Sequence, residues 1–157
     1  MSFFQRLSLS GSLVMLAAAP SPASAAINGD VLTFIASPPL WRGSTTEHSG
    51  VFDFKEDTVT IMLDHKKACG DIVFDRDNGW LCKANGHVAA GKHVVAVNFT
   101  DNKNKPHRLR ATLTLRAEDK KFEMPDNPTG GEQFWCVSIT MTKIALMPKS
   151  DGRCHTD

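Results

Sequence analysis

The segment His107–Ala117, HRLRATLTLRA, decides the fold class. Leu109, Ala111, Leu113 and Leu115 alternate with arginine and threonine, which is the period of a β-strand with one apolar and one polar face. A sheet with one solvated face is typically antiparallel. The helical period of 3.6 residues is hard to find anywhere in the chain, so we expect an all-β protein.

The segment Lys92–Phe99 is predicted to be the antiparallel partner of this strand. The turn-rich sequence TDNKNKP connects the two segments. Pairing Phe99 with Leu109 places the valines of one strand and the leucines of the other on a common face. That agreement favours this register, because a slip of one residue would turn one of the apolar sets toward water.

Short apolar segments separated by turns predict seven or eight strands in all. The expected fold is a single antiparallel β-sandwich or small barrel stapled by disulfides, with a mixed α+β fold as the alternative. The other predicted strands are Val31–Ile35, a hairpin of Val51–Phe54 with Thr58–Leu63, a hairpin of Asp71–Phe74 with Trp80–Ala84, and Phe134–Met147 with a bulge near Thr142 and Lys143.

Residues 1–25 have the pattern of a cleavable signal peptide. Arg6 is their only charged residue, and an apolar run from Leu7 to Ala19 precedes the small residues Ala23-Ser24-Ala25. The run is too short to span a bilayer, which takes about 20 apolar residues. We therefore expect a secreted or periplasmic protein whose mature part, residues 26–157, is a single β domain without a transmembrane segment.

The four cysteines are predicted to form two disulfides. Cys69, Cys82, Cys136 and Cys154 are an even set behind a signal peptide, and no Cys-x-x-Cys motif indicates a zinc or redox site. Proximity in sequence favours Cys69–Cys82 and Cys136–Cys154, with a bridge from Cys82 to Cys136 as the main alternative.

The charge balance argues against a nucleic-acid partner. Removing Arg6 with the signal peptide leaves 17 basic and 17 acidic residues, whereas nucleic-acid-binding domains usually have a clear basic excess. The sequence contains no P-loop and no dinucleotide fingerprint, so we expect no cofactor.

The mature protein is expected to be a monomer.

No catalytic or metal-ligating residue is assigned from the sequence. None of the histidines has a strong ligand spacing, and no nucleophile elbow is present. A small secreted hydrolase that uses histidine as acid and base, and a periplasmic metal-binding protein, remain alternatives. The six histidines are His48, His65, His87, His93, His107 and His155.

Two surfaces are candidates for binding. The first is the loop that carries Trp41 and Arg42, because these residue types often anchor interfaces and Pro38 and Pro39 stiffen the loop. For Trp41 itself the first interpretation is that it folds back over the end of the sandwich as a plug, and the exposed anchor comes second. The second surface is the arginine face of the strand at 107–117, unless it is only a solvated face. We favour the loop, in a non-catalytic domain that binds a protein or glycan partner, with an inhibitor- or immunity-like role.

Overall fold

The computed structural model of the protein describes residues 31–43, 50–122, 133–148 and 154. These residues form strands and two short 3-10 helices but no α-helix, so the all-β prediction is confirmed. The predicted signal peptide lies outside them. The elements are β1 (Val31–Ala36), β2 (Trp41–Arg42), β3 (Val51–Phe52), η1 (Glu56–Thr58), β4 (Thr60–Leu63), β5 (Lys66–Lys67), β6 (Trp80–Lys83), β7 (Gly91–Thr100), β8 (Pro106–Leu115), η2 (Ala117–Asp119), β9 (Lys121–Phe122), β10 (Gln133–Ile139) and β11 (Ile144–Leu146).

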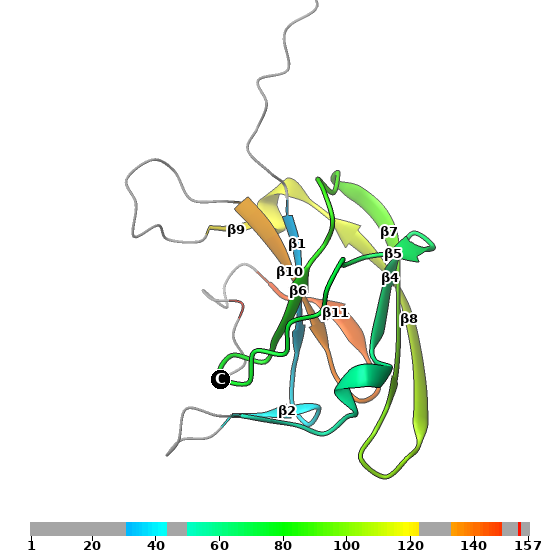
Figure 1. Cartoon of the computed structure of the whole chain (residues 1–157). Helices are drawn as coiled ribbons and strands as arrows, with labels where there is room; N and C mark the ends of the chain where they lie inside the picture. Colours follow the sequence, from blue (N-terminus) through cyan, green and yellow to red (C-terminus); the bar gives the residue numbers. More distant parts are fainter. Residues whose placement is uncertain (1–30, 44–49, 123–132, 149–153, 155–157) are drawn as a thin grey trace, which may run out of the picture.

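The strands form two larger sheets and one small ribbon. The first sheet has the order β11-β10-β1-β6, with β9 also paired to β10, and the second has the order β5-β4-β7-β8. Strands β2 and β3 pair only with each other. The two larger sheets remain separate and do not close into a barrel, so the sandwich form of the prediction describes the fold (Figure 1).

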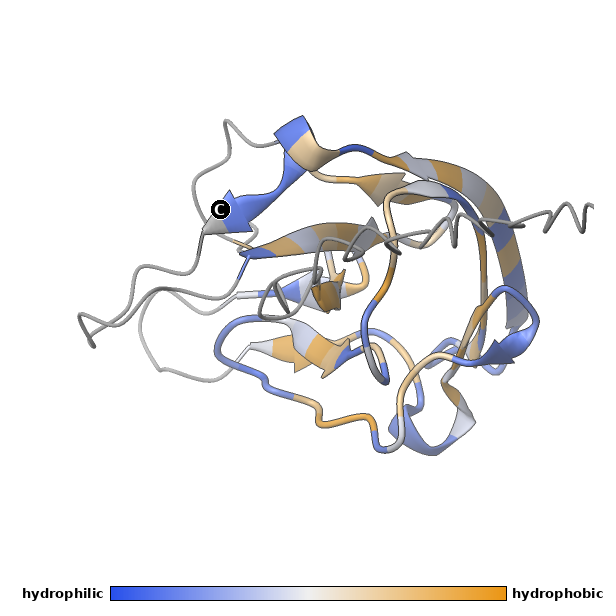
Figure 2. Cartoon of the chain, turned by 90° about the horizontal axis from the view of Figure 1, so that it is seen from above, coloured by the Kyte–Doolittle hydropathy of each residue, from blue (hydrophilic) through white to orange (hydrophobic). Residues whose placement is uncertain are grey.

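One core lies between the two sheets. The first sheet contributes side chains such as Phe34, Trp135 and Val137, and the second contributes Val95 and Val97, all at most 1% exposed. Polar residues alternate with the core residues along the long strands, and Figure 2 shows this alternation as bands of orange and blue. The apolar period of the sequence therefore sets which face of each strand is buried.

Strand β1 is the centre of the first sheet and is buried along its whole length. It pairs with β10 in parallel, from Val31 opposite Phe134 to Ala36 opposite Ile139, and with β6 in antiparallel. The expectation of a purely antiparallel fold was therefore wrong at this pair. The nearly continuous apolar sequence VLTFIA is typical of a strand that is covered on both faces.

The pairing of β7 with β8 is confirmed, but the predicted register was wrong by two residues. Phe99 lies opposite His107 rather than Leu109, and Val97 lies opposite Leu109. A shift of two leaves every side chain on its predicted face, because successive side chains alternate. The connection is shorter than expected because the Asp101 carboxylate accepts hydrogen bonds from the turn, as described below.

The predicted hairpin of Val51–Phe54 with Thr58–Leu63 does not form. Phe52 lies opposite Trp41, and Phe54 bridges to Asp101 at the end of β7. Strand β4 instead pairs with β7, where Ile61 lies opposite Val97. The predicted pairing and the observed pairing bury the same apolar residues, so the local sequence does not distinguish between them.

The predicted bulge near Thr142 and Lys143 is a turn that separates two strands. Thr140 accepts hydrogen bonds from the backbone N–H of both residues through its hydroxyl oxygen, at 3.4 and 3.0 Å, and β11 then returns antiparallel to β10. The change of apolar phase in the sequence is therefore a reversal of the chain.

Both favoured disulfides are present, Cys69–Cys82 and Cys136–Cys154. The alternative from Cys82 to Cys136 is excluded by the sheet, because Cys82 pairs with Phe34 on one side of β1 and Cys136 pairs with Thr33 on the other. Two strand spacings of about 4.8 Å separate them, beyond the roughly 7 Å that a disulfide tolerates. The Cys69–Cys82 bridge ties β6 of the first sheet to the segment that follows β5 of the second.

Candidate functional site

The described histidines do not gather into one site. His65, His87, His93 and His107 fall in the described part of the chain, whereas His48 and His155 lie outside it. Nowhere in residues 31–43, 50–122, 133–148 and 154 do three or more His, Cys, Asp or Glu side chains form a group that could hold a metal ion. Of the four described histidines, only His93 and His107 have a described carboxylate partner.

His93 is fixed through both of its ring nitrogens. Nδ1 lies 2.6 Å from Asp64 Oδ2, and Nε2 lies 2.8 Å from the backbone oxygen of Ala89. A carboxylate and a carbonyl oxygen both accept, so both bonds form together only when each nitrogen carries a hydrogen. No ring nitrogen remains for a substrate, and His93 in this arrangement holds structure rather than acting as a general base.

Asp64 supports the tight turn between β4 and β5. Asp64 and His65 have positive φ angles of 48° and 67°, which suit the type I′ hairpin turn usually made by Asn-Gly. The Asp64 Oδ1 atom accepts the Val94 N–H at 2.8 Å and so ties the turn to β7. This backbone bond first, and the His93 side chain second, lower the pKa of Asp64 from its usual 3.8.

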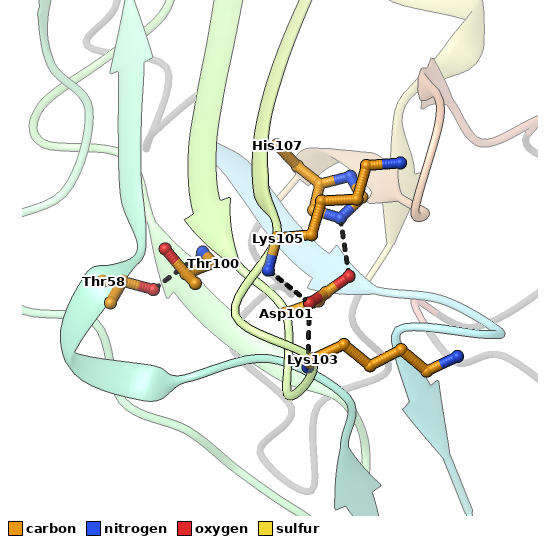
Figure 3. Close-up of polar contacts among 6 residues, drawn as sticks. All are labelled: Thr58, Thr100, Asp101, Lys103, Lys105 and His107. Atoms are coloured by element: carbon orange, nitrogen blue, oxygen red, sulfur yellow. Dashed lines mark hydrogen bonds and ion pairs between the residues drawn. The ribbon is translucent and has the colours of Figure 1, made fainter.

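Asp101 organises the turn between β7 and β8 (Figure 3). Its Oδ1 accepts the backbone N–H groups of Lys103 and Lys105, each at 2.8–2.9 Å, and its Oδ2 lies 2.9 Å from His107 Nε2. The His107 ring stacks on Phe99 with 4.8 Å between ring centroids. The hydrogen bond from His107 is the main reason that the pKa of Asp101 is lowered, followed by the bond from Lys105.

The Asp101–His107 pair has no nucleophile bonded to it within the described part of the chain. Among the described residues, no hydroxyl or thiol is bonded to His107. The nearby Thr58 hydroxyl forms its hydrogen bonds with other groups. It accepts the Thr100 N–H at 2.9 Å and donates to the Lys55 carbonyl at 2.7 Å. The cluster therefore fixes the hairpin turn between β7 and β8.

Trp41 is a core residue, so the interpretation as an exposed anchor needs correction. Its side chain is 6% exposed, and its indole N–H donates to the Arg76 carbonyl at 2.8 Å. Gly50 and Gly79 lie against the ring so closely that a Cβ at either position would collide with it. Trp41 therefore forms the plug described above. A buried indole is stabilised by the large apolar area that it removes from water, provided that its N–H has an acceptor.

Arg42, the second candidate of the loop, is exposed and paired. Its Nη2 lies 2.9 Å from Asp53 Oδ1, and both side chains contact solvent. A surface pair of this kind contributes about 0–1 kcal/mol. Residues 44–49 of the same loop lie outside the described part of the chain. The described part of the loop therefore offers one neutralised cation and no accessible aromatic ring.

The outer face of the second sheet is the remaining candidate. Its side chains alternate with the core residues of β4, β7 and β8 and point away from the core. We call it the basic sheet face, and it consists of Thr60, Met62, Lys67, Lys92, Val94, Ala96, Asn98, Arg108, Arg110, Thr112 and Thr114.

The charges of this face are all positive. Lys67, Lys92, Arg108 and Arg110 are exposed, and none of them forms an ion pair with another described residue. Asp64, in the turn between β4 and β5, has both carboxylate oxygens bonded, to His93 and to the Val94 N–H. The chain as a whole has 18 basic and 17 acidic residues, so its charge is balanced but unevenly distributed.

The sequence indicated only part of this face. The alternation in β8 placed Arg108 and Arg110 on one side, whereas Arg116 follows the end of the strand. Lys67 was not expected there, because it reaches the face through β5, a two-residue strand with no recognisable period. The signal that would have found it is the two-residue turn at Asp64 and His65, which returns the chain beside β4.

Comparisons with protein-family models, with curated proteins and with solved structures find no match for this chain. Among the described residues no helix is long and apolar enough to cross a membrane.

Proposed function

We propose that the protein is a secreted or periplasmic β domain that binds an anionic protein or glycan partner through the basic sheet face and catalyses no reaction. The observation that carries the proposal is the set of four exposed cations on one sheet face with no carboxylate among them. Unpaired like charges repel one another, and an anionic partner relieves that repulsion.

The disulfides support the location. Two disulfides in one small domain are typical of an oxidising compartment. The arrangement of the histidines supports a binding role over the hydrolase alternative, since the nitrogens of His93 are both occupied and His107 has no nucleophile bonded to it within the described chain.

The test compares three immobilised forms of the chain. They are the wild type, the face variant Arg108→Ala with Arg110→Ala, and the control variant Arg76→Ala with Lys143→Ala. Both variants lose two exposed positive charges, but Arg76 and Lys143 lie outside the second sheet, and Arg76 is paired with Glu56 at 2.9 Å.

Each form is exposed to an extract of the native extracytoplasmic compartment and eluted with salt, and protein and carbohydrate are both quantified. We expect the wild type and the control to retain a salt-eluted partner, and the face variant to retain at least about tenfold less, since two lost contacts of about 0.7 kcal/mol each give this factor. Equal retention by all three forms contradicts the proposal.

A further inference from the structure

The cations of the basic sheet face are spread both along and across the strands of the second sheet. Arg108 and Arg110 lie two residues apart on β8, which is about 7 Å along the strand. Lys67 and Arg110 are at opposite ends of one row, which crosses four strands and spans about 14 Å. This row runs Lys67, Met62, Ala96, Arg110. The spacing suits a ligand that carries several negative charges along its length.

The centre of the face has no anchor for a folded protein partner. Interfaces between proteins have a desolvated core enriched in aromatic side chains and depleted of charge. Here the centre consists of Val94 and Ala96 on β7, beside exposed arginines, and the face contains no aromatic residue. The lack of aromatic rings also removes the stacking platform on which single-stranded nucleic acids usually bind.

Between the cations the face is lined with small hydrogen-bonding groups. Asn98 donates its side-chain N–H to the Thr60 hydroxyl at 3.2 Å, which leaves the Thr60 hydroxyl hydrogen and the Asn98 carbonyl oxygen without a partner among the described residues. Thr112 and Thr114 are exposed on the neighbouring strand. Hydroxyl and amide groups of this kind match a ligand that is rich in hydroxyls of its own.

We propose that the partner is an acidic polysaccharide, a linear chain of sugars bearing carboxylate or sulfate groups, which lies extended on the basic sheet face. The inference rests on the proposed binding function and names its partner. The cations supply a salt-dependent attraction, and the threonine and asparagine groups bond to the sugar hydroxyls. A stiff polymer loses little conformational entropy when it binds along an open sheet face, so no deep pocket is needed.

The test measures binding of the full chain to four probes by calorimetry. The probes are alginate, which is carboxylated, heparin, which is sulfated, polyglutamate, and a single-stranded oligothymidylate, all compared at equal charge concentration. We expect one of the two polysaccharides to bind at least about tenfold more tightly than polyglutamate and the oligonucleotide. This affinity should fall at least about tenfold between 50 and 500 mM salt, because the attraction is screened.

Variants separate the face from other sources of attraction. The face variant Arg108→Ala with Arg110→Ala should weaken polysaccharide binding at least about tenfold, and the control Arg76→Ala with Lys143→Ala should weaken it less than about threefold. Thr112→Val, which removes a hydroxyl but no charge, should weaken binding about two- to fivefold at every salt concentration, whereas a purely electrostatic attachment would not respond to it.

Other outcomes overturn the inference in distinguishable ways. If polyglutamate binds as tightly as the polysaccharides, the partner is an acidic protein segment, and the binding function itself stands. Preference for the oligonucleotide likewise overturns the polysaccharide assignment. If no probe binds while the wild-type column still retains a partner that the face variant loses, the inference fails alone. If no probe binds and the column retains nothing, the proposed function fails with it.

Discussion

The indole N–H of Trp41 donates to the backbone carbonyl of Arg76 at 2.8 Å, which joins positions 35 residues apart in the chain. The bond closes the ribbon of β2 and β3 against the loop that precedes β6. The backbone N–H of Gly50 donates to the same carbonyl at 2.7 Å. The Arg76 carbonyl thus holds both the Trp41 segment and the Gly50 segment, and the Trp41 indole covers the adjacent part of the core.

Replacing Trp41 should destabilise the fold rather than affect binding alone. We expect Trp41→Ala to lower the free energy of unfolding by about 3–5 kcal/mol, because it removes a buried ring and leaves a cavity. Trp41→Phe keeps much of the volume but removes the donor to Arg76, so a smaller loss of about 1–3 kcal/mol is expected. Urea denaturation measures both. A wild-type midpoint for Trp41→Ala would contradict the buried position.

Gly79 should resist substitution more strongly than Gly86. Both have positive φ, 66° and 73°, so an alanine at either position is strained by about 1–2 kcal/mol. At Gly79 a Cβ would also lie 2.6 Å from the Ala36 oxygen and 2.9 Å from the Trp41 ring, whereas nothing lies within 4 Å at Gly86. Gly86→Ala is therefore the matched control, and Gly79→Ala should have the lower denaturation midpoint. Equal midpoints would show that the contacts at Gly79 relax without cost.

The Cys69–Cys82 bridge should stabilise the domain by about 3 kcal/mol. This is the contribution expected when a bridge between cysteines 13 residues apart lowers the conformational entropy of the unfolded chain. Both cysteines are buried, so Cys69→Ala with Cys82→Ala avoids adding a polar group to the core. The free energy of unfolding by urea, measured for this variant and the wild type, gives the difference. A loss below about 1 kcal/mol would mean that packing alone holds the two sheets at this edge.

Acid should destabilise the protein through Asp64 and Asp101. Both carboxyls have a pKa below the usual 3.8 in the folded state, so the unfolded chain binds protons first as the pH falls. Their contribution to stability is complete above about pH 5 and is lost progressively below about pH 4, as the pH falls through the lowered pKa values. Urea denaturation at pH 6, 4 and 3 measures this loss.

The double variant Asp64→Asn with Asp101→Asn should be less stable than the wild type at pH 6 and should lose less stability on acidification. Asp77→Asn is the control, because its exposed side chain takes part in neither turn. If the double variant shows the same acid dependence as the wild type, the two carboxyls are not the groups responsible.

The sequence by itself determined the features that depend on local chemistry. The alternation in HRLRATLTLRA placed each β8 side chain on its correct face, because the apolar period of a strand is two whatever its partner. The cysteine spacing favoured the disulfides that the structure contains, because each pair is close in sequence. The turn residues marked where strands end.

Only the tertiary structure decided which strands pair and which surface is available. The parallel pairing of β1 with β10 joins segments about a hundred residues apart, and no local period encodes a contact at that distance. The sequence left open whether Trp41 is an exposed anchor or a plug. In the structure the Arg76 carbonyl accepts its N–H, and Gly79, which has no Cβ, leaves room for its ring in the core. The burial of a large side chain depends on the shape that distant segments build around it, and that shape is a property of the folded chain.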